Sequence, residues 1–195
     1  MLTELDICRG IIEGALPSPT DWQNSTYVAL RLSGTGVAFR PSLNEYVYRS
    51  PDIWLSPDMQ RRLLGVPIII EHAPGGMMTS QYFGERCVGF VAATYVNDDE
   101  RSIWGVARIL DSNAIKIISA GLFDTSPAIL LPPGKSAQAN VGDHMCLVES
   151  EPLFIDHVAL VFMGEGNKGV WSRDDGPGVQ VDEPQQSAAD LENVT

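Results

Sequence analysis

Cysteine and long apolar runs are both scarce in this chain of 195 residues. The three cysteines, Cys8, Cys87 and Cys146, are an odd number and form no CxxC pair, so they indicate no disulfide framework and favour a reducing compartment. No apolar run approaches the roughly 20 residues that a membrane-spanning helix requires. The opening residues, MLTELD, include two acids and no base, unlike a secretory signal. These absences predict a soluble, intracellular protein.

Positive charge is also in short supply. Thirteen lysines and arginines face 25 acidic residues, which gives a formal net charge of -12 at pH 7. Such a chain would be repelled by phosphate backbones, so its charge argues against general nucleic-acid binding. The sequence also lacks a GxSxG elbow and the HxH, HxxxH or HExxH spacings of metal sites. We therefore expect neither an α/β-hydrolase nor a metal or other cofactor.

Turn-forming residues, in contrast, are plentiful: 18 glycines and 13 prolines favour short elements and a strand-rich fold. The sequence predicts an α+β protein that is mainly β, with residues 1–168 folded and 169–195 forming an acidic, disordered tail. Residues 132–142 are expected to be a polar loop. Strands are expected at 27–32, 37–40, 46–49, 66–72, 87–96, 103–110, 123–131, 145–149 and 154–163, and helices at 1–16, 57–64 and 113–120. The strands at 87–96 and 103–110 are expected to form a hairpin, preceded by a loop with two methionines. Ser56 is the expected cap of the second helix, and Asp111 or Ser112 that of the third.

A histidine lies inside the apolar run at 154–163, next to an aspartate. A buried imidazole without a partner costs about 1–3 kcal/mol, so His157 must find one. It could be a core histidine bonded to a backbone carbonyl, or it could belong to a site. His72 ends another predicted strand, and Ser126 lies in a third.

Serine becomes a nucleophile when a neighbouring histidine takes its proton, and that histidine needs an orienting group. Ser126, His72 and His157 could therefore form a catalytic set if their strands are neighbours, with Asp156 and His144 as further candidates. Each also has a structural interpretation: His72 as a strand-end residue, Ser126 as a turn serine and His144 as a solvated loop residue. A metal site built on the three histidines is an alternative without support from ligand spacing.

Three segments form a recognisable pattern in a fixed order: VPIIIEHAP at 66–74, GLFDTSPAIL at 121–130 and IDHVALVFMG at 155–164. The pattern consists of a histidine at the end of a PxxxEH strand, an SP strand after a helix that ends in glycine, and an HVALV run. Together the segments resemble the prohead maturation proteases of tailed bacteriophages, which belong with the herpesvirus assemblins in one serine-protease superfamily. The similarity covers roughly residues 45–165.

The resemblance implies a Ser-His-His triad in which Ser126 is the nucleophile, His72 the general base and His157 the residue that orients His72. It implies a small assemblin-like β-barrel of about seven strands flanked by short helices. The implied activity is a serine endopeptidase of phage head maturation, which cleaves scaffold and capsid-precursor segments and also itself. Those proteins would be its partners inside the immature prohead in the host cytoplasm, and a homodimer is allowed. Neither nucleic acid nor membrane is an implied partner.

The chain departs from the family pattern after the HVALV run. Relatives usually have arginine there, which in assemblins supports the oxyanion site, whereas this chain continues from Met163 through Glu165 to Lys168. Loss of one oxyanion donor typically lowers the rate about 100- to 1,000-fold, although Lys168 or backbone N–H groups could substitute. A second departure is Asp156, where asparagine is common. The missing arginine leaves an alternative open: an inactive protease-fold protein that is a structural or scaffold component of the capsid.

Overall fold

The computed structural model describes residues 1–121, 123–163, 169–171 and 178–182. These residues form an α+β fold that is mainly β, as the sequence predicts. The helices are α1 (Glu4–Ile12), α2 (Pro51–Trp54), α3 (Pro57–Leu63), α4 (Ser80–Arg86) and α5 (Ser112–Ser119), with a 3-10 helix η1 at Pro41–Leu43. The strands are β1 (Thr20–Trp22), β2 (Ser25–Gly34), β3 (Gly36–Arg40), β4 (Glu45–Arg49), β5 (Pro67–Ile70), β6 (Cys87–Asn97), β7 (Ser102–Ile109), β8 (Phe123–Leu130), β9 (Ala137–Val141), β10 (His144–Glu149) and β11 (Phe154–Phe162).

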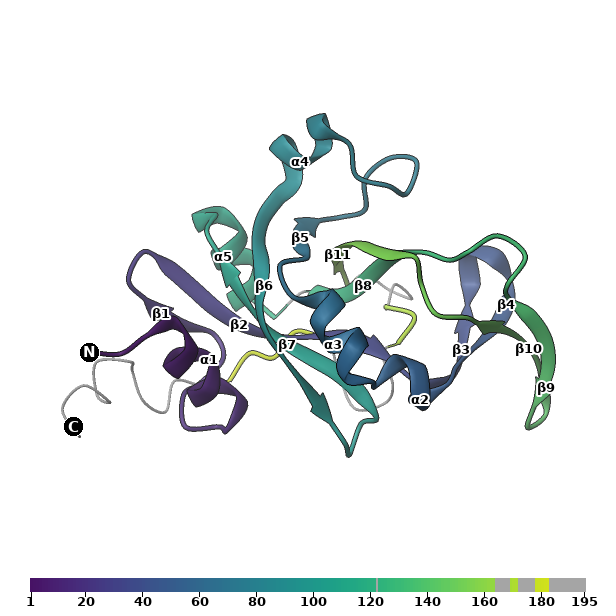
Figure 1. Cartoon of the computed structure of the whole chain (residues 1–195). Helices are drawn as coiled ribbons and strands as arrows, with labels where there is room; N and C mark the ends of the chain where they lie inside the picture. The colour runs from purple at the N-terminus through teal and green to yellow at the C-terminus, as the bar shows by residue number, and fades with distance from the viewer. Residues whose placement is uncertain (122, 164–168, 172–177, 183–195) are drawn as a thin grey trace.

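A seven-stranded sheet with the order β1-β2-β7-β6-β5-β11-β8 forms the centre of the molecule (Figure 1). Strand β2 is buried at every residue, and its central apolar run at 27–30 contributes to the core. The predicted hairpin of β6 and β7 is confirmed, and its turn is held by the Asn97 side chain, which accepts the N–H of Glu100 at 3.1 Å. Strands β5 and β11 run parallel, whereas the other neighbours in this sheet are antiparallel.

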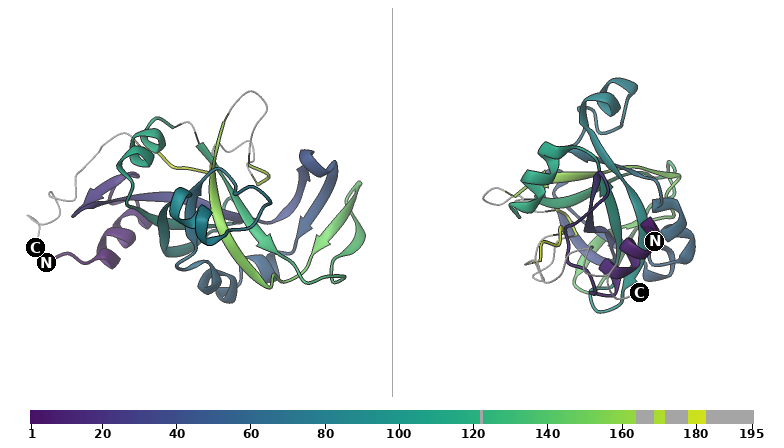
Figure 2. Two further views of the ribbon diagram at one scale, coloured as in Figure 1. Left: turned by 90° about the horizontal axis from the view of Figure 1, so that it is seen from above. Right: turned by 90° about the vertical axis from the view of Figure 1, so that its left-hand side faces the viewer.

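A separate four-stranded sheet with the order β3-β4-β10-β9 extends from one end, opposite α1 (Figures 1 and 2). The expected loop at 132–142 therefore contains a strand, because β9 pairs antiparallel with β10. The polar composition of this segment concealed the strand, since much of β9 is exposed to solvent.

The predicted closed barrel is wrong, because the strands divide between two sheets and the larger sheet remains open. The edge of β2 that a closing strand would need is occupied by the segment 178–182. Within that pairing, the N–H of Arg31 donates to the carbonyl of Gly178 at 2.7 Å. Strand β8, at the far edge of the sheet, reaches β2 through a side chain instead: the hydroxyl of Thr125 donates to the carbonyl of Arg31 at 2.5 Å.

Part of the predicted acidic tail, 169–195, packs against the folded body. Val179 is 3% exposed and belongs to the main core, and Trp171 is 6% exposed. The prediction of disorder therefore fails for 169–171 and 178–182, and the rest of the tail lies outside the described residues. The apolar side chains of Trp171 and Val179 are enough to anchor these two short segments. Two such residues change the average composition of the tail very little.

Side-chain caps begin the helices at the positions that the sequence predicts for α3 and α5. The hydroxyl of Ser56 accepts the N–H of Met59 at 3.1 Å, and the Asp111 carboxylate accepts the N–H of Ala114 at 2.7 Å. Helix α4, which was expected to be loop, rises above the larger sheet together with the segment that follows β5 (Figure 1). Among the described residues, no helix is long and apolar enough to cross a bilayer.

Candidate active site

Strand β11 lies between β5 and β8 in the larger sheet, and the three predicted site residues come from these three strands. His157 lies within β11, Ser126 lies within β8, and His72 follows the end of β5 by two residues. Ala159 of β11 is opposite Ser126, so the nucleophile candidate lies close to His157 across the ladder. The strand order thus collects residues that are far apart in the sequence.

Glu71 turns the chain out of the sheet immediately before His72. Its backbone has a φ of 56°, in the left-handed region, and its N–H donates to the carbonyl of Leu160 at 3.0 Å. Its carboxylate accepts the N–H of Phe162 at 2.8 Å. Because both bonds go to β11, they hold the backbone of His72 against the strand that carries His157.

The three side chains form a continuous line of contacts. The Oγ of Ser126 lies 2.9 Å from Nε2 of His72, and Nδ1 of His72 lies 2.9 Å from Nε2 of His157. Both distances are within the range of good hydrogen bonds. His157 is fully buried, whereas His72 and Ser126 are at least partly open to solvent. A substrate could therefore reach the serine, and the inner histidine is protected from water.

Asp156, one of the further candidates in the sequence, extends this line of contacts beyond His157. Its Oδ2 lies 2.7 Å from Nδ1 of His157. Adjacent residues of a regular strand point to opposite faces, so an aspartate beside a histidine gives no reason to expect contact. The register between β11 and β8 shifts between Ile155 and His157, and this bulge falls at Asp156. No sequence signal predicts that bulge.

The environment of His72 favours the neutral imidazole. Partial removal of its ring from water lowers its pKa, the neighbouring His157 lowers it further, and Glu71 opposes both effects. A neutral imidazole is the form that accepts a proton. The direction of the pKa shift therefore suits a general base at neutral pH.

The residues before Ser126 are fixed by a buried carboxylate. Asp124 is 1% exposed and accepts the N–H groups of Gly169 at 2.9 Å and Gly178 at 2.8 Å. A Cβ on Gly178 would lie 2.4 Å from Oγ1 of Thr125, and a Cβ on Gly169 would lie 2.3 Å from the Thr125 carbonyl oxygen. Only glycine permits this close approach, so β8 packs tightly against the segments 169–171 and 178–182.

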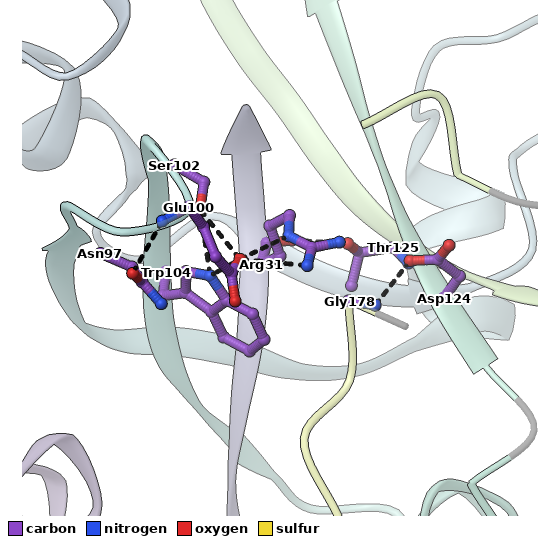
Figure 3. Close-up of polar contacts among 8 residues, drawn as sticks. All are labelled: Arg31, Asn97, Glu100, Ser102, Trp104, Asp124, Thr125 and Gly178. Carbon is purple, nitrogen blue, oxygen red and sulfur yellow. Dashed lines mark hydrogen bonds and ion pairs between the residues drawn. The ribbon is translucent and has the colours of Figure 1, made fainter. Parts of the chain in front are cut away.

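A wider polar network connects these contacts of β8, through β2, to the turn between β6 and β7 (Figure 3). Arg31 of β2 is buried and pairs with Glu100 of the β6–β7 turn at 3.0 Å. Glu100 also accepts from the indole nitrogen of Trp104 at 2.9 Å. Since the Arg31 carbonyl accepts from Thr125, the network extends to the residue before Ser126. It positions the nucleophile candidate without contacting it.

A cavity of about 240 Å³ adjoins Ser126, bounded by β8 and by strands of the smaller sheet. Its charged side contains Glu149, which pairs with Arg49 at 2.5 Å and with Arg40 at 3.1 Å. The ring of Trp171 lies over the Arg49 guanidinium, 4.3 Å from its carbon. The apolar side includes Val47, Pro127, Ile129, Leu131 and Val170. The cavity has room for a single substrate side chain.

His144 is not part of this site. It lies in β10 of the smaller sheet, where its ring stacks on Tyr46 with centroids 4.0 Å apart. Across the described part of the chain, no group of three or more histidine, cysteine or acidic side chains could hold a metal ion. The segment 164–168, which contains the departure from the expected arginine, lies outside the described residues.

The described contacts comprise a serine, two imidazoles and a carboxylate in series, beside a cavity. Comparisons of the chain with protein-family models, with curated proteins and with solved structures found no match.

Proposed function

We propose that this chain is a serine endopeptidase in which Ser126 is the nucleophile, His72 the general base and His157 the group that orients the base. The observation that carries this proposal is the pair of 2.9 Å contacts that joins Ser126 Oγ through both nitrogens of His72 to His157. A base within hydrogen-bond reach of a hydroxyl, itself held by a third group, is the arrangement that activates serine.

The proposed reaction has two stages. Ser126 Oγ attacks the carbonyl carbon of a peptide bond while its proton moves to Nε2 of His72, and His72 then gives this proton to the departing amine. The C–N bond breaks and an ester on Ser126 remains. Water, deprotonated by His72, hydrolyses the ester, and the returned proton regenerates the hydroxyl. Throughout, His157 accepts from Nδ1 of His72 and stabilises its cationic form.

The substrate class in this proposal comes from the resemblance to prohead maturation proteases. The substrates would be scaffold and capsid-precursor segments inside an immature phage head, together with the protease itself, and a homodimer is allowed. The cavity beside Ser126 supports a peptide substrate, because its apolar wall and charged side could hold one side chain next to the reacting carbonyl.

A fluorophosphonate probe tests the nucleophile, and co-expression with the capsid precursor tests the substrate. We expect the probe to label Ser126 in the wild type and in Ser119→Ala, an exposed serine at the end of α5, but not in Ser126→Ala. Precursor cleavage should follow the same pattern. An unlabelled wild type that leaves the precursor intact, and that remains full-length in mature particles, would support the structural alternative instead.

The rate of cleavage is expected to fall in acid with a midpoint below the usual histidine pKa of about 6.5. The pKa of His72 is lowered, mainly by burial, so its neutral form persists to lower pH than that of a free imidazole. Two charged side chains lie beside His72: Glu71, and Arg86, whose guanidinium donates to the His72 carbonyl. Measuring kcat/KM against pH checks the midpoint, and Glu71→Gln should move it still lower. A wild-type midpoint above 6.5 would contradict this prediction.

A further inference from the structure

The side chains of Asp156 and His157 meet although they are neighbours in one strand. The bulge in β11 allows this, because Ile155 and His157 are opposite the consecutive residues Ile129 and Ala128 of β8, which leaves Asp156 as the extra residue. The carboxylate is 11% exposed and the imidazole is fully buried, so their 2.7 Å contact is largely shielded from water.

The carboxylate of Asp156 determines the direction of every hydrogen bond in the line. An ionised carboxylate only accepts, so Nδ1 of His157 must carry the hydrogen. Nε2 of a neutral His157 is then an acceptor, and Nδ1 of His72 must donate to it. This leaves the lone pair of His72 Nε2 facing Ser126, which is the state that a general base requires.

Without that acceptor the two imidazoles could reverse their roles. His157 could donate from Nε2 to Nδ1 of His72, and Nε2 of His72 would then carry a hydrogen. In that state His72 has no free lone pair for the proton of Ser126. The contact distances are compatible with either direction, so the chemistry of the terminal group decides between them.

Asp156 also connects the line to the segment that follows His72. Its Oδ2 accepts the backbone N–H of Met78 at 2.7 Å, in addition to its contact with His157. The carboxylate thus bonds the strand that carries one histidine and the segment that follows the other. Both bonds require a hydrogen-bond acceptor at Oδ2 of Asp156. The contact with His157 depends in addition on the negative charge of the carboxylate.

We propose that Asp156 is a positioning residue that sets the tautomers of His157 and His72 and supplies the negative charge for their cationic state. This inference rests on the proposed protease function. When the proton of Ser126 moves to His72, the imidazole of His72 becomes positively charged. His72 donates to His157 and His157 donates to Asp156, so the carboxylate of Asp156 stabilises this charge through the two hydrogen bonds. The Ser-His-His line is therefore completed by an acid that is largely shielded from water.

Nitrogen-15 NMR of histidine-labelled full-length protein tests the tautomers directly. The chain has only three histidines, and His144→Gln identifies the third signal. We expect hydrogen on Nδ1 of both His72 and His157 in the wild type and in Asp143→Asn, an exposed acid that matches the change in charge. Asp156→Ala should lose this preference. An unchanged tautomer pattern in Asp156→Ala would overturn the proposal.

Kinetics separate positioning from simple stabilisation of the fold. Asp156→Asn has the same shape and keeps an acceptor for Met78, but it carries no charge. We expect kcat to fall roughly 10- to 100-fold with KM little changed, less than the roughly 10⁴-fold loss when a directly bonded carboxylate is replaced. Unchanged tautomers in Asp156→Ala, together with a fall in kcat and a lower unfolding midpoint, would show a structural role and overturn the proposal. If the wild type has the expected tautomers but is not labelled at Ser126, the protease function fails separately.

Discussion

Replacing His72 with alanine is expected to lower kcat for precursor cleavage on the order of 10⁴- to 10⁶-fold, with little change in KM. His72 is the only side chain described within hydrogen-bond distance of the Ser126 hydroxyl, at 2.9 Å. Without it the hydroxyl keeps its proton and is a poor nucleophile. Initial rates over a range of substrate concentrations measure both constants.

The other two histidines provide graded controls for this prediction. His157→Ala should cost less than His72→Ala, because His157 contacts the base and not the hydroxyl. His144→Ala should leave kcat unchanged, since its ring stacks on Tyr46 in the smaller sheet. Equal losses for His72→Ala and His144→Ala, or an active His72→Ala, would contradict the assignment of the base.

Replacing Glu149 with glutamine is expected to lower the free energy of unfolding by about 3–5 kcal/mol, the usual cost of breaking a buried ion pair. Glu149 is 2% exposed and pairs with Arg49 at 2.5 Å and Arg40 at 3.1 Å. Burial lowers the pKa of Arg49, and Glu149 counteracts this shift. Glutamine keeps the shape of the side chain, so the loss measures the charge. Urea unfolding followed by tryptophan fluorescence gives the free energy.

Glu151 is the matched control for this experiment, because it is an acidic residue close by in sequence with an exposed ion pair. Its side chain is 59% exposed and it pairs with Arg62. Glu151→Gln should change the free energy of unfolding by less than about 1 kcal/mol, as exposed pairs contribute little. Similar losses for the two variants would show that the Glu149 cluster is no more stabilising than a surface pair.

Local chemistry was sufficient to predict much of the fold. Ser56 and Asp111 cap helices where their sequence context indicates, and the turn at Asn97 joins two strands with the expected boundaries to within a residue or two. These features depend on hydrogen bonds between residues a few positions apart, so a short stretch of sequence contains all the information. Strand β9 was not predicted, because its alternating apolar residues are mostly small, it is partly exposed and it lies in a segment of polar composition.

Long-range features could not be predicted in the same way. The open edge of the larger sheet depends on Gly178 pairing with Arg31, which are separated by most of the chain. The apolar pair Trp171 and Val179 anchors segments whose average composition indicates disorder. Composition is an average over a segment, whereas packing depends on one or two side chains that find a matching surface.

By itself, the sequence determined which residues were available for chemistry: Ser126, His72 and His157, with Asp156 and His144 as further candidates, each in or beside a predicted strand. Only the tertiary structure decided that β11 lies between β5 and β8, which brings Ser126 and His72 to 2.9 Å. It also decided that Asp156 turns towards His157. The physical reason is that strand order and a one-residue bulge set which side chains face one another, and both arise from pairing between distant parts of the chain.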